Sequence, residues 1–500
     1  MSLKTFIVKQ AAKAITKNLQ KQAEHAVEYQ EKIMQKLVKE GRNTVFGHDH
    51  GFDKIKDYNS YKVHVPVQDY EEMKGYIERI NNGELNILWK GRPKYYAKTS
   101  GTTSGTKYIP LTKESIPNHF GTARNAVFNY MATTGKADFM DGKLMFLSGS
   151  PEMDKKGDIL VGRLSGISNH MIPGWLKTNQ MPSYPTNCIE DWEQKLDKIV
   201  QETLKADMRL ISGIPPWVQM YYERLLQVTG KKTILDIFPN LSMFVYGGVN
   251  FEPYRAQLES LVGARIPSIE TYPASEGFIA YQDRQDEKGL LLNTNSGIFF
   301  EFIPADEIFK PNPTRIWLKD VEIGVNYALV MNTNAGLWGY SIGDTVQFVS
   351  KNPYRIVVSG RVKHFISAFG EHVIGKEVEE AMLSVAAQEG IRIVEFTVAP
   401  QVAPPDGTKP YHEWFVEFDN EPLNLQSFAQ KVDIAMQGQN IYYKDLIEGN
   451  ILQTLKIRPM QKDTFREYMK SIGKLGGQNK VPRLSNDRKI ADELLKYLKI

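Results

Sequence analysis

Compact apolar runs that end in glycine or another turn residue constrain the fold of this chain most strongly. They occupy residues 143–149, 208–215 and 241–248. Each has the length of one strand, and a continuous apolar run is typical of a strand buried on both faces of a sheet. The intervening segments 190–206 and 216–229 show the apolar spacing of helices. This alternation predicts an α/β core with buried strands.

The pattern changes at about residue 290. Strand-like runs dominate residues 290–357, where we expect a β-rich subdomain. Helical and strand-like segments then alternate again. We therefore predict a large N-terminal domain over residues 1–357, a smaller α+β domain over residues 358–500, and a hinge at about 358–364. The length of 500 residues agrees with two domains, because single cores stop growing at about 250–300 residues.

Two helices are expected near the N-terminus. Residues 2–40 have a helical pattern, in which Lys9, Lys13, Lys17 and Lys21 recur every four positions opposite an apolar stripe. Residues 66–82 form a second helical segment, which ends at Asn81, Asn82 and Gly83. A basic amphipathic helix can lie on a membrane surface. A solvated face on a docked helix is the more common case, and we expect that here.

Charge and cysteine content exclude several classes of protein. The chain has 62 Lys plus Arg against 58 Asp plus Glu, a net charge of +4 without a concentrated basic stripe, so we expect no nucleic-acid partner. The single cysteine, Cys188, excludes an intrachain disulfide and suits a reducing cytoplasm. No apolar stretch approaches the ~20 residues of a spanning helix. We expect a cytoplasmic protein and, without a coiled coil, a monomer.

The segment from Thr99 to Lys107 is the most specific local pattern. A polyphosphate needs close backbone approach, several N–H and hydroxyl donors and a cation, which glycine, small hydroxyl residues and a lysine supply. The spacing differs from a Walker A loop, because Thr106 separates Gly105 from the lysine. A flexible turn is the alternative, but the density of hydroxyls favours phosphate binding. The residues are Thr99, Ser100, Gly101, Thr102, Thr103, Ser104, Gly105, Thr106 and Lys107.

Three further segments, in order, give the chain a family resemblance. With the loop, they resemble the core motifs of the adenylate-forming superfamily, which includes acyl-CoA synthetases, luciferases and peptide-synthetase adenylation domains. The residues of these motifs are more similar to those of the GH3 family of acyl-acid amido synthetases. The length of the chain is that of the bacterial-type members of this family. The superfamily motifs are 271–278, 339–348 and 359–373, and the GH3-like segments are 43–52, 65–80, 246–250 and 476–484.

The resemblance implies a role for each motif residue. Lys107, Glu276 and Lys480 would act in catalysis, with Glu276 associated with Mg²⁺ and Lys480 contacting the reacting carboxylate. Asp344 would accept hydrogen bonds from both ribose hydroxyls. Lys363 would be the pivot of a rotating C-terminal domain. The remaining nucleotide-binding residues would be Ser100, Gly101, Thr102, Thr103, Ser104, Gly105, Gly247, Gly248, Val249, Tyr272, Ser275, Tyr340 and Arg361.

Three of these assignments have plain structural alternatives. Glu276 can be a surface glutamate or one at a helix N-terminus, and Pro273 suggests a turn. Asp344 can belong to a Gly-Asp hairpin turn. Lys480 can be a solvated loop lysine, because it precedes Pro482-Arg483 whereas the superfamily lysine follows such a pair.

The implied activity has two half-reactions that use ATP and Mg²⁺. A carboxylic acid is first activated as an acyl-adenylate, and an amine, expected to be an amino acid, then attacks the acyl carbon. One alternative is an acyl-CoA synthetase with a thiol acceptor. Another, from a different class, is a nucleotide-binding protein without turnover.

Overall fold

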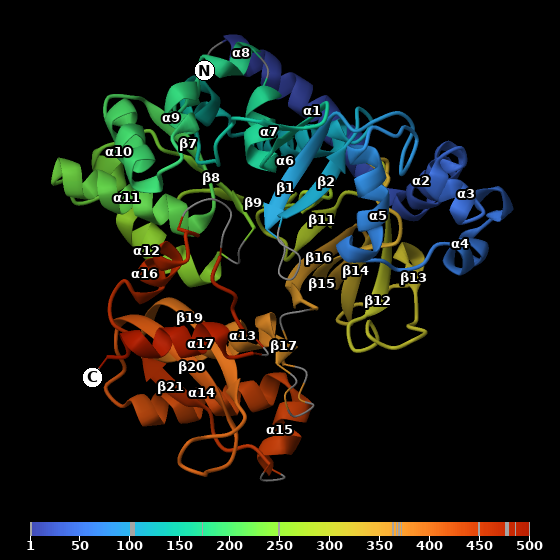
Figure 1. Cartoon of the computed structure of the whole chain (residues 1–500). Coiled ribbons are helices and arrows are strands. Elements are labelled where there is room, and N and C mark those ends of the chain that lie inside the picture. The colour runs from blue at the N-terminus through green and yellow to red at the C-terminus, as the bar shows by residue number, and fades with distance from the viewer. Residues whose placement is uncertain are drawn as a thin grey trace. The chain divides into compact units, whose positions relative to one another are not determined.

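The computed structural model describes residues 3–100, 106–172, 174–248, 251–362, 365–366, 368, 371, 373–448, 451–475, 480–485 and 487–499 (Figure 1). The chain divides into two compact units. The large unit comprises Met1–Val249, Gln257–Ile342 and Val346–Val357, and the small unit comprises Asn250–Ala256, Gly343–Thr345 and Val358–Ile500. The two short segments of the small unit were not anticipated from the sequence.

The main sheet of the large unit has twelve strands in the described part of the chain. Their order is β13-β12-β14-β15-β16-β11-β10-β9-β8-β7-β3-β6. Neighbours from β9 to β6 pair in parallel, as expected for an α/β core, and the β-rich region continues this same sheet. The bounds are β3 Lys143–Phe146, β6 Gln180–Met181, β7 Met208–Ser212, β8 Met243–Gly247, β9 Ser268–Pro273, β10 Phe278–Tyr281, β11 Leu290–Leu292, β12 Ile298–Pro304, β13 Ile316–Trp317, β14 Asn326–Thr333, β15 Tyr340–Lys351 and β16 Tyr354–Arg361.

A second, four-stranded sheet carries the ends of the predicted phosphate loop. Its described strands, in the order β2-β1-β5-β4, are Thr106–Leu111, Tyr95–Ser100, Ile159–Gly162 and Asp154–Lys156. Strands β1 and β2 lie side by side and pair antiparallel, with Ser100 opposite Thr106 (Figure 1). The predicted loop therefore closes a β-hairpin.

The N-terminal segment forms two helices, not the single helix predicted over residues 2–40. Helix α1 spans Leu3–Glu24 and α2 spans Ala26–Gly41, because His25 has non-helical φ/ψ of −110° and 30°. The break lets each helix bury a different face. Ala12 of α1 packs in an apolar cluster with α6, Ile116–Thr134, while Gln30 of α2 is buried and donates to the carbonyls of Thr294 and Ile298.

The second predicted helix begins later than expected. Helix α5 spans Tyr70–Asn81, and the Asp69 carboxylate caps it by accepting from the Glu71 and Glu72 amides. The preceding residue, Gln68, is extended and forms a parallel bridge with Tyr340. Hydrogen bonding to β15 therefore replaces the first helical turn that the sequence pattern suggested.

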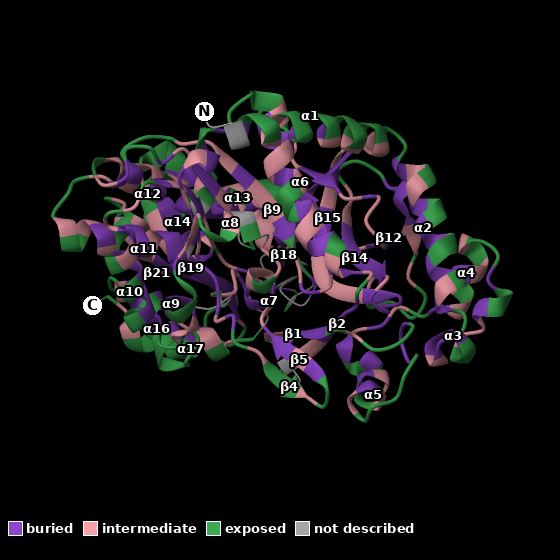
Figure 2. Cartoon of the chain, turned by 90° about the horizontal axis from the view of Figure 1, so that it is seen from above, coloured by how far each residue is buried: buried purple, intermediate pink, exposed green. Residues whose placement is uncertain are grey.

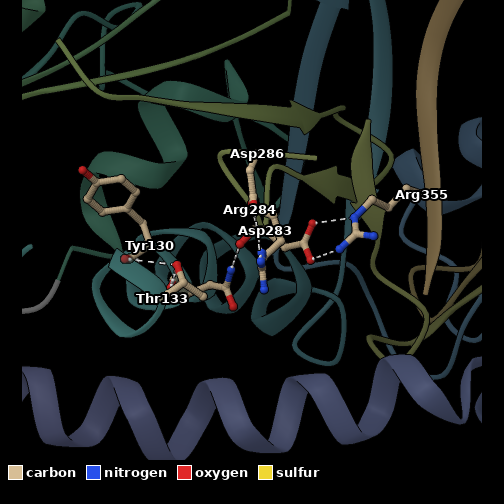
Figure 3. Close-up of polar contacts among 7 residues, drawn as sticks. Tyr130, Thr133, Asp283, Arg284, Asp286 and Arg355 are labelled. Atoms are coloured by element: carbon tan, nitrogen blue, oxygen red, sulfur yellow. Dashed lines mark hydrogen bonds and ion pairs between the residues drawn. The ribbon is translucent and has the colours of Figure 1, made fainter. Parts of the chain in front are cut away.

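A buried ion pair ties together strands of the main sheet. Figure 3 shows Asp283, just beyond β10, facing Arg355 of β16. The Arg355 Nε and Nη2 atoms donate to the two Asp283 carboxylate oxygens at 3.0 and 2.7 Å. Asn129 of α6 donates to the Asp283 carbonyl. These contacts hold the strand that follows residue 277 at a defined place in the sheet.

The small unit is an α+β sandwich around a three-stranded sheet. The described strands β19, β20 and β21 span Arg392–Gln401, Tyr411–Asn420 and Lys456–Pro459. Helices α13, Gly375–Glu389, and α14, Leu425–Gln439, pack with alternate residues of one sheet face. Helices α16, Thr464–Ser471, and α17, Lys489–Leu494, pack with the other. In Figure 2 the strands are largely buried and the outer helix faces exposed.

The remaining elements are short or connect these layers. In the described part of the chain, no helix is both long and apolar enough to cross a membrane. The other elements are α3 Val45–Asp49, η1 Phe52–Lys54, α4 Tyr58–His64, η2 Asp138–Asp141, α7 Leu164–His170, α8 Gly174–Lys177, α9 Tyr184–Cys188, α10 Trp192–Thr203, α11 Pro215–Thr229, η3 Ile234–Asp236, α12 Glu252–Val262, η4 Leu318–Asp320, β17 Phe365–Ile366, β18 Val373–Ile374, α15 Ile441–Glu448 and η5 Leu495–Tyr497.

Candidate functional site

Lys107 lies at the start of β2, where the predicted phosphate loop returns to the sheet. Its ammonium lies over the ring of Tyr70, 5.7 Å from the ring centroid. The buried Tyr70 hydroxyl accepts a 2.9 Å hydrogen bond from the Tyr108 amide, the next residue of the strand. Tyr70 therefore contacts the loop's lysine through its ring and fixes the adjoining backbone through its hydroxyl.

Glu276 lies in a tight turn between β9 and β10. The amides of Ala274 and Gly277 each donate to the carbonyl of the other, at 2.9 and 3.2 Å. A Cβ at Gly277 would lie 2.5 Å from Ile298 Cδ1, so a larger residue would require the Ile298 side chain to move. Asn118 of α6 accepts from the Phe278 amide at 2.7 Å and donates to its carbonyl at 3.3 Å. The turn is thus fixed from both sides, and it presents a half-buried Glu276.

The Tyr340 hydroxyl contacts Glu276 and lies near enough to Tyr70 for the two to interact electrostatically. It forms a side-chain hydrogen bond with Glu276. Burial raises the pKa of Tyr340 far above its usual value, and the nearby Glu276 carboxylate, Tyr70 and Asp69 raise it further. The hydroxyl therefore stays protonated and donates to Glu276. We call Tyr70, Lys107, Glu276 and Tyr340 the phosphate-side cluster.

A buried polar network lies beneath Tyr340. The Asn332 side chain accepts from the Gly339 amide at 2.6 Å and donates to Glu301 at 2.7 Å. Glu301 is fully buried and pairs with Arg315 at 2.6 Å. Gly339 has a φ of +55°, and a Cβ there would lie 2.0 Å from the Pro66 carbonyl. The glycine and the hydrogen bond from its amide to Asn332 therefore fix the backbone conformation before Tyr340.

The other predicted residues of the large unit occupy different surroundings. Tyr272 is buried in an apolar cluster and pairs with Ala280 of β10, while Ser275 is buried in the turn beside Glu276. Gly247 ends β8, where a Cβ would lie 2.4 Å from the Thr271 carbonyl, and Gly248 has a φ of +82°. Both glycines are thus required by the backbone. Contact of any of these residues with a nucleotide stays a prediction.

Asp344 and Arg361 form an ion pair within the small unit. Arg361 Nε, at the end of β16, donates to Asp344 Oδ1 at 2.7 Å. Asp344 lies within β15, so the alternative of a hairpin turn is wrong. Its side chain is 17% exposed, and a carboxylate can accept several hydrogen bonds at once. The ion pair and a ribose diol are therefore compatible at this carboxylate.

Lys480 lies in the loop before Arg483 and is exposed to solvent. Even so, the desolvation caused by surrounding protein lowers the pKa of its ammonium to about 8; Asp344 opposes this, Arg361 adds to it, and Glu379 opposes it. Both the ammonium and the neutral amine forms of Lys480 are therefore populated at a pH near 8.

Arg483 anchors the segment that carries Lys480. Its Nε donates to Glu379 of α13 at 2.8 Å, and its Nη1 pairs with Glu395 of β19 and donates to the Phe396 carbonyl at 2.7 Å. The guanidinium also lies over the Phe396 ring, 4.2 Å from the centroid. We call Asp344, Arg361, Glu379, Lys480 and Arg483 the charged cluster.

Several predicted residues lie outside the described part of the chain. These are Gly101, Thr102, Thr103, Ser104, Gly105, Val249 and Lys363, and for Ser100 only the backbone is described. The sequence reasoning assigned no role to Tyr70, Glu379 or Arg483. Their contacts are made across elements far apart in the chain, so no local pattern signals them.

Models of the GH3 family match the chain in three places. The N-terminal domain model matches residues 15–180, the central domain model residues 291–361 and the C-terminal domain model residues 376–489. Together they cover well over half of the chain, which therefore belongs to the GH3 family, as the sequence predicts.

Known relatives and structures agree with this assignment. Jasmonoyl–L-amino acid synthetase JAR4 of Nicotiana attenuata is 22% identical, covering 91% of this chain and 90% of its own length. Indole-3-acetic acid-amido synthetase GH3.3 of Arabidopsis thaliana is 22% identical, covering 91% and 88%. These names describe the ligase class that the sequence predicts.

The solved structures confirm the predicted fold class. The GH3.15 acyl acid amido synthetase matches with a TM-score of 0.79 at 16% identity, over 98% of this chain and 97% of that chain. A 2-hydroxyisobutyryl-CoA ligase in the postadenylation state matches with a TM-score of 0.54 at 13% identity, over 97% and 92%. The large α/β part and the smaller α+β part thus belong to the adenylate-forming fold.

Proposed function

We propose that this protein is an ATP-dependent ligase that joins a carboxylic acid to an amine, expected to be an amino acid. The phosphate-side cluster is the observation that carries the proposal. In a chain of the GH3 family, it brings a lysine beside a Ser/Thr/Gly loop into one group with a carboxylate suited to Mg²⁺.

In the first half-reaction, a carboxylate oxygen of the acid attacks the α-phosphorus of ATP. The bond between the α-phosphorus and the oxygen that bridges the α- and β-phosphates breaks, pyrophosphate leaves with that oxygen, and an acyl-adenylate forms. The main obstacle is repulsion between two anions, which positioned cations and N–H donors relieve. Lys107 would neutralise phosphate charge here, with the hydroxyls and amides of the loop as further donors.

Glu276 fits a role at a magnesium ion. In the described residues, no group of three or more His, Cys, Asp or Glu side chains could hold a metal by itself. Mg²⁺ is commonly bound by one or two carboxylates together with substrate phosphates. Glu276 supplies one such carboxylate, and the Tyr340 hydroxyl orients it. The ion, when bound with ATP, would offset phosphate charge.

The charged cluster supplies the groups proposed to bind the ribose and the reacting carboxylate. Asp344 would accept from the ribose hydroxyls, and the Lys480 ammonium would stabilise the reacting carboxylate and the α-phosphate. Arg361 holds one Asp344 oxygen at 2.7 Å and so limits the orientation of that carboxylate. Domain rotation about the 358–364 hinge, the cytoplasmic location and the monomeric state stay predictions.

In the second half-reaction, the nitrogen of a neutral amine attacks the acyl carbon of the adenylate. The bond between the acyl carbon and the oxygen that joins it to phosphorus breaks, and AMP leaves with that oxygen. The nitrogen loses a proton as the amide forms. An amine is the expected acceptor because the relatives named above are amido synthetases.

A mass-spectrometric screen tests the proposal. The purified protein is incubated with ATP, Mg²⁺ and a carboxylate panel in three arms, containing mixed amino acids, coenzyme A or no acceptor. The expected result is AMP and an amide conjugate in the first arm. A thioester in the second arm alone would identify an acyl-CoA synthetase. ATP binding without AMP in any arm would indicate a nucleotide-binding protein.

A further inference from the structure

Tyr70 contacts one side of the phosphate-side cluster and follows a backbone segment that is hydrogen-bonded to the other side. It is the first residue of α5 and is buried, with 5% of its surface exposed. One side of the cluster, Lys107, lies on β2 of the four-stranded sheet. The other side, Tyr340 and the Glu276 turn, belongs to the twelve-stranded sheet. The two sheets are separate, so the distance between Lys107 and Glu276 depends on contacts that join one sheet to the other.

The backbone before Tyr70 is fixed to the twelve-stranded sheet. The Gln68 amide donates to the Gly339 carbonyl at 2.8 Å, and the Gln68 carbonyl accepts from the Ser341 amide at 2.8 Å. These bonds lie on both sides of Tyr340. The Gln68 side chain adds a 3.2 Å hydrogen bond to the Trp338 carbonyl. The start of α5 therefore moves with the strand that carries Tyr340.

The side chain of Tyr70 is fixed to the four-stranded sheet. Its hydroxyl accepts from the Tyr108 amide at 2.9 Å, and its ring lies under the Lys107 ammonium. A cation over an aromatic face is attracted by the ring's negative quadrupole. Tyr70 thus restricts both the strand position and the direction of the lysine.

We infer that Tyr70 is a positioning residue that sets where the Lys107 ammonium stands relative to Glu276, and thereby controls affinity for the β- and γ-phosphates of ATP and for pyrophosphate. The inference rests on the proposed function. It assigns no chemistry to Tyr70, which acts through Lys107 and the Tyr108 backbone.

A purely structural role would give a different result, and the same helix offers a matched control. Tyr76 of α5 also carries a hydroxyl in a side-chain hydrogen bond, donating to Asp49 at 2.9 Å, and its ring packs against Phe46. In the described contacts, Tyr76 touches neither Lys107 nor the β2 backbone. Tyr76→Phe therefore reports the cost of removing a tyrosine hydroxyl from α5.

The experiment compares Tyr70→Phe, Tyr70→Leu and Tyr76→Phe in ATP–pyrophosphate exchange, using an acid found in the screen. Tyr70→Phe removes the acceptor of one hydrogen bond and should raise KM for ATP and pyrophosphate about 3- to 10-fold. Tyr70→Leu also removes the ring beneath Lys107 and should raise both about 10- to 50-fold. KM for the acid and all values for Tyr76→Phe should stay within about twofold of wild type.

Direct binding of MgATP, measured by calorimetry, separates the two possible failures. Wild-type protein that binds MgATP while Tyr70→Leu binds it equally well would overturn the inference alone. Equal increases in KM for acid and nucleotide would also overturn it, as would a Tyr70→Leu variant that unfolds while Tyr70→Phe behaves as wild type. Wild-type protein that binds no MgATP would overturn the proposed function.

Discussion

The phosphate-side cluster and the charged cluster are built differently. In the first, the buried Tyr70 contacts Lys107, the buried Tyr340 contacts Glu276, and a glycine-constrained backbone leads into Tyr340. In the second, five charged side chains lie close together, and Arg361 and Lys480 keep contact with solvent. One cluster is positioned by packing and neutral hydrogen bonds, the other by ion pairs.

This difference suggests that the two clusters have different roles in the proposed reaction. The phosphates and their ion carry nearly constant charge, so a rigid arrangement suits them. The steps proposed for the charged cluster involve a carboxylate that reacts and an amine that must be neutral. Titratable groups near physiological pH suit such steps. Substitutions should therefore affect stability and nucleotide affinity at the first cluster, and pH dependence at the second.

The largest effect is expected from breaking the frame beneath the phosphate-side cluster. Arg315→Met leaves Glu301 as an unpaired, fully buried carboxylate, so the free energy of unfolding should fall by about 3–5 kcal/mol. Chemical denaturation measures it. Arg265→Met is the matched control, because Arg265 is 75% exposed and pairs with Glu259 at 3.7 Å. Equal, small losses in both variants would show that the frame is not needed.

Glu276→Gln should give the next largest effect. The amide keeps the size of the side chain and its hydrogen bond with Tyr340, but it is a poor ligand for Mg²⁺. Exchange kcat should fall about 10²- to 10³-fold, with little change in stability. The control is Glu287→Gln, an exposed residue beyond β10. Full activity of Glu276→Gln at saturating Mg²⁺ would remove this residue from the proposed site.

The pH profile of adenylation should depend on Lys480. The pKa of this group is lowered to about 8, so its ammonium is present below that pH and is lost above it. If the ammonium is required, the exchange rate should fall about tenfold for each pH unit above 8. In Lys480→Arg the guanidinium stays charged, and the alkaline fall should disappear. An unchanged profile in this variant would assign the titration to another group.

Glu379→Gln should produce the smallest effect. Its carboxylate raises the pKa of Lys480, so its removal should move the alkaline fall to lower pH while leaving the rate at pH 7 nearly unchanged. Glu380→Gln, an exposed neighbour on α13, is the control. A shift to higher pH would contradict the electrostatic account of this cluster.

The α/β core could be predicted because each parallel strand is a short apolar run with its own boundary signals. The motifs around Glu276 and Asp344 could be identified because they are local strings of residues. Mid-helix breaks such as His25 could not, since the apolar spacing continues across it.

Contacts between distant segments could not be predicted from the sequence either. The start of α5 is displaced because Gln68 pairs with Tyr340, a partner 272 positions away. Tyr70 lies within the helical segment predicted over residues 66–82, and only the register of β2 places Lys107 over its ring. Likewise, Arg483 is recognisable as an anchor only once Glu379 and Glu395 are seen around it.

The most direct test of carboxylate adenylation follows oxygen. An acid labelled with ¹⁸O in both carboxylate positions is converted with ATP and its amino acid, and the nucleotide product is analysed by mass spectrometry. If the carboxylate attacks the α-phosphorus, AMP must carry one ¹⁸O per amide formed. ADP with labelled phosphate, or AMP without label, would contradict the acyl-adenylate.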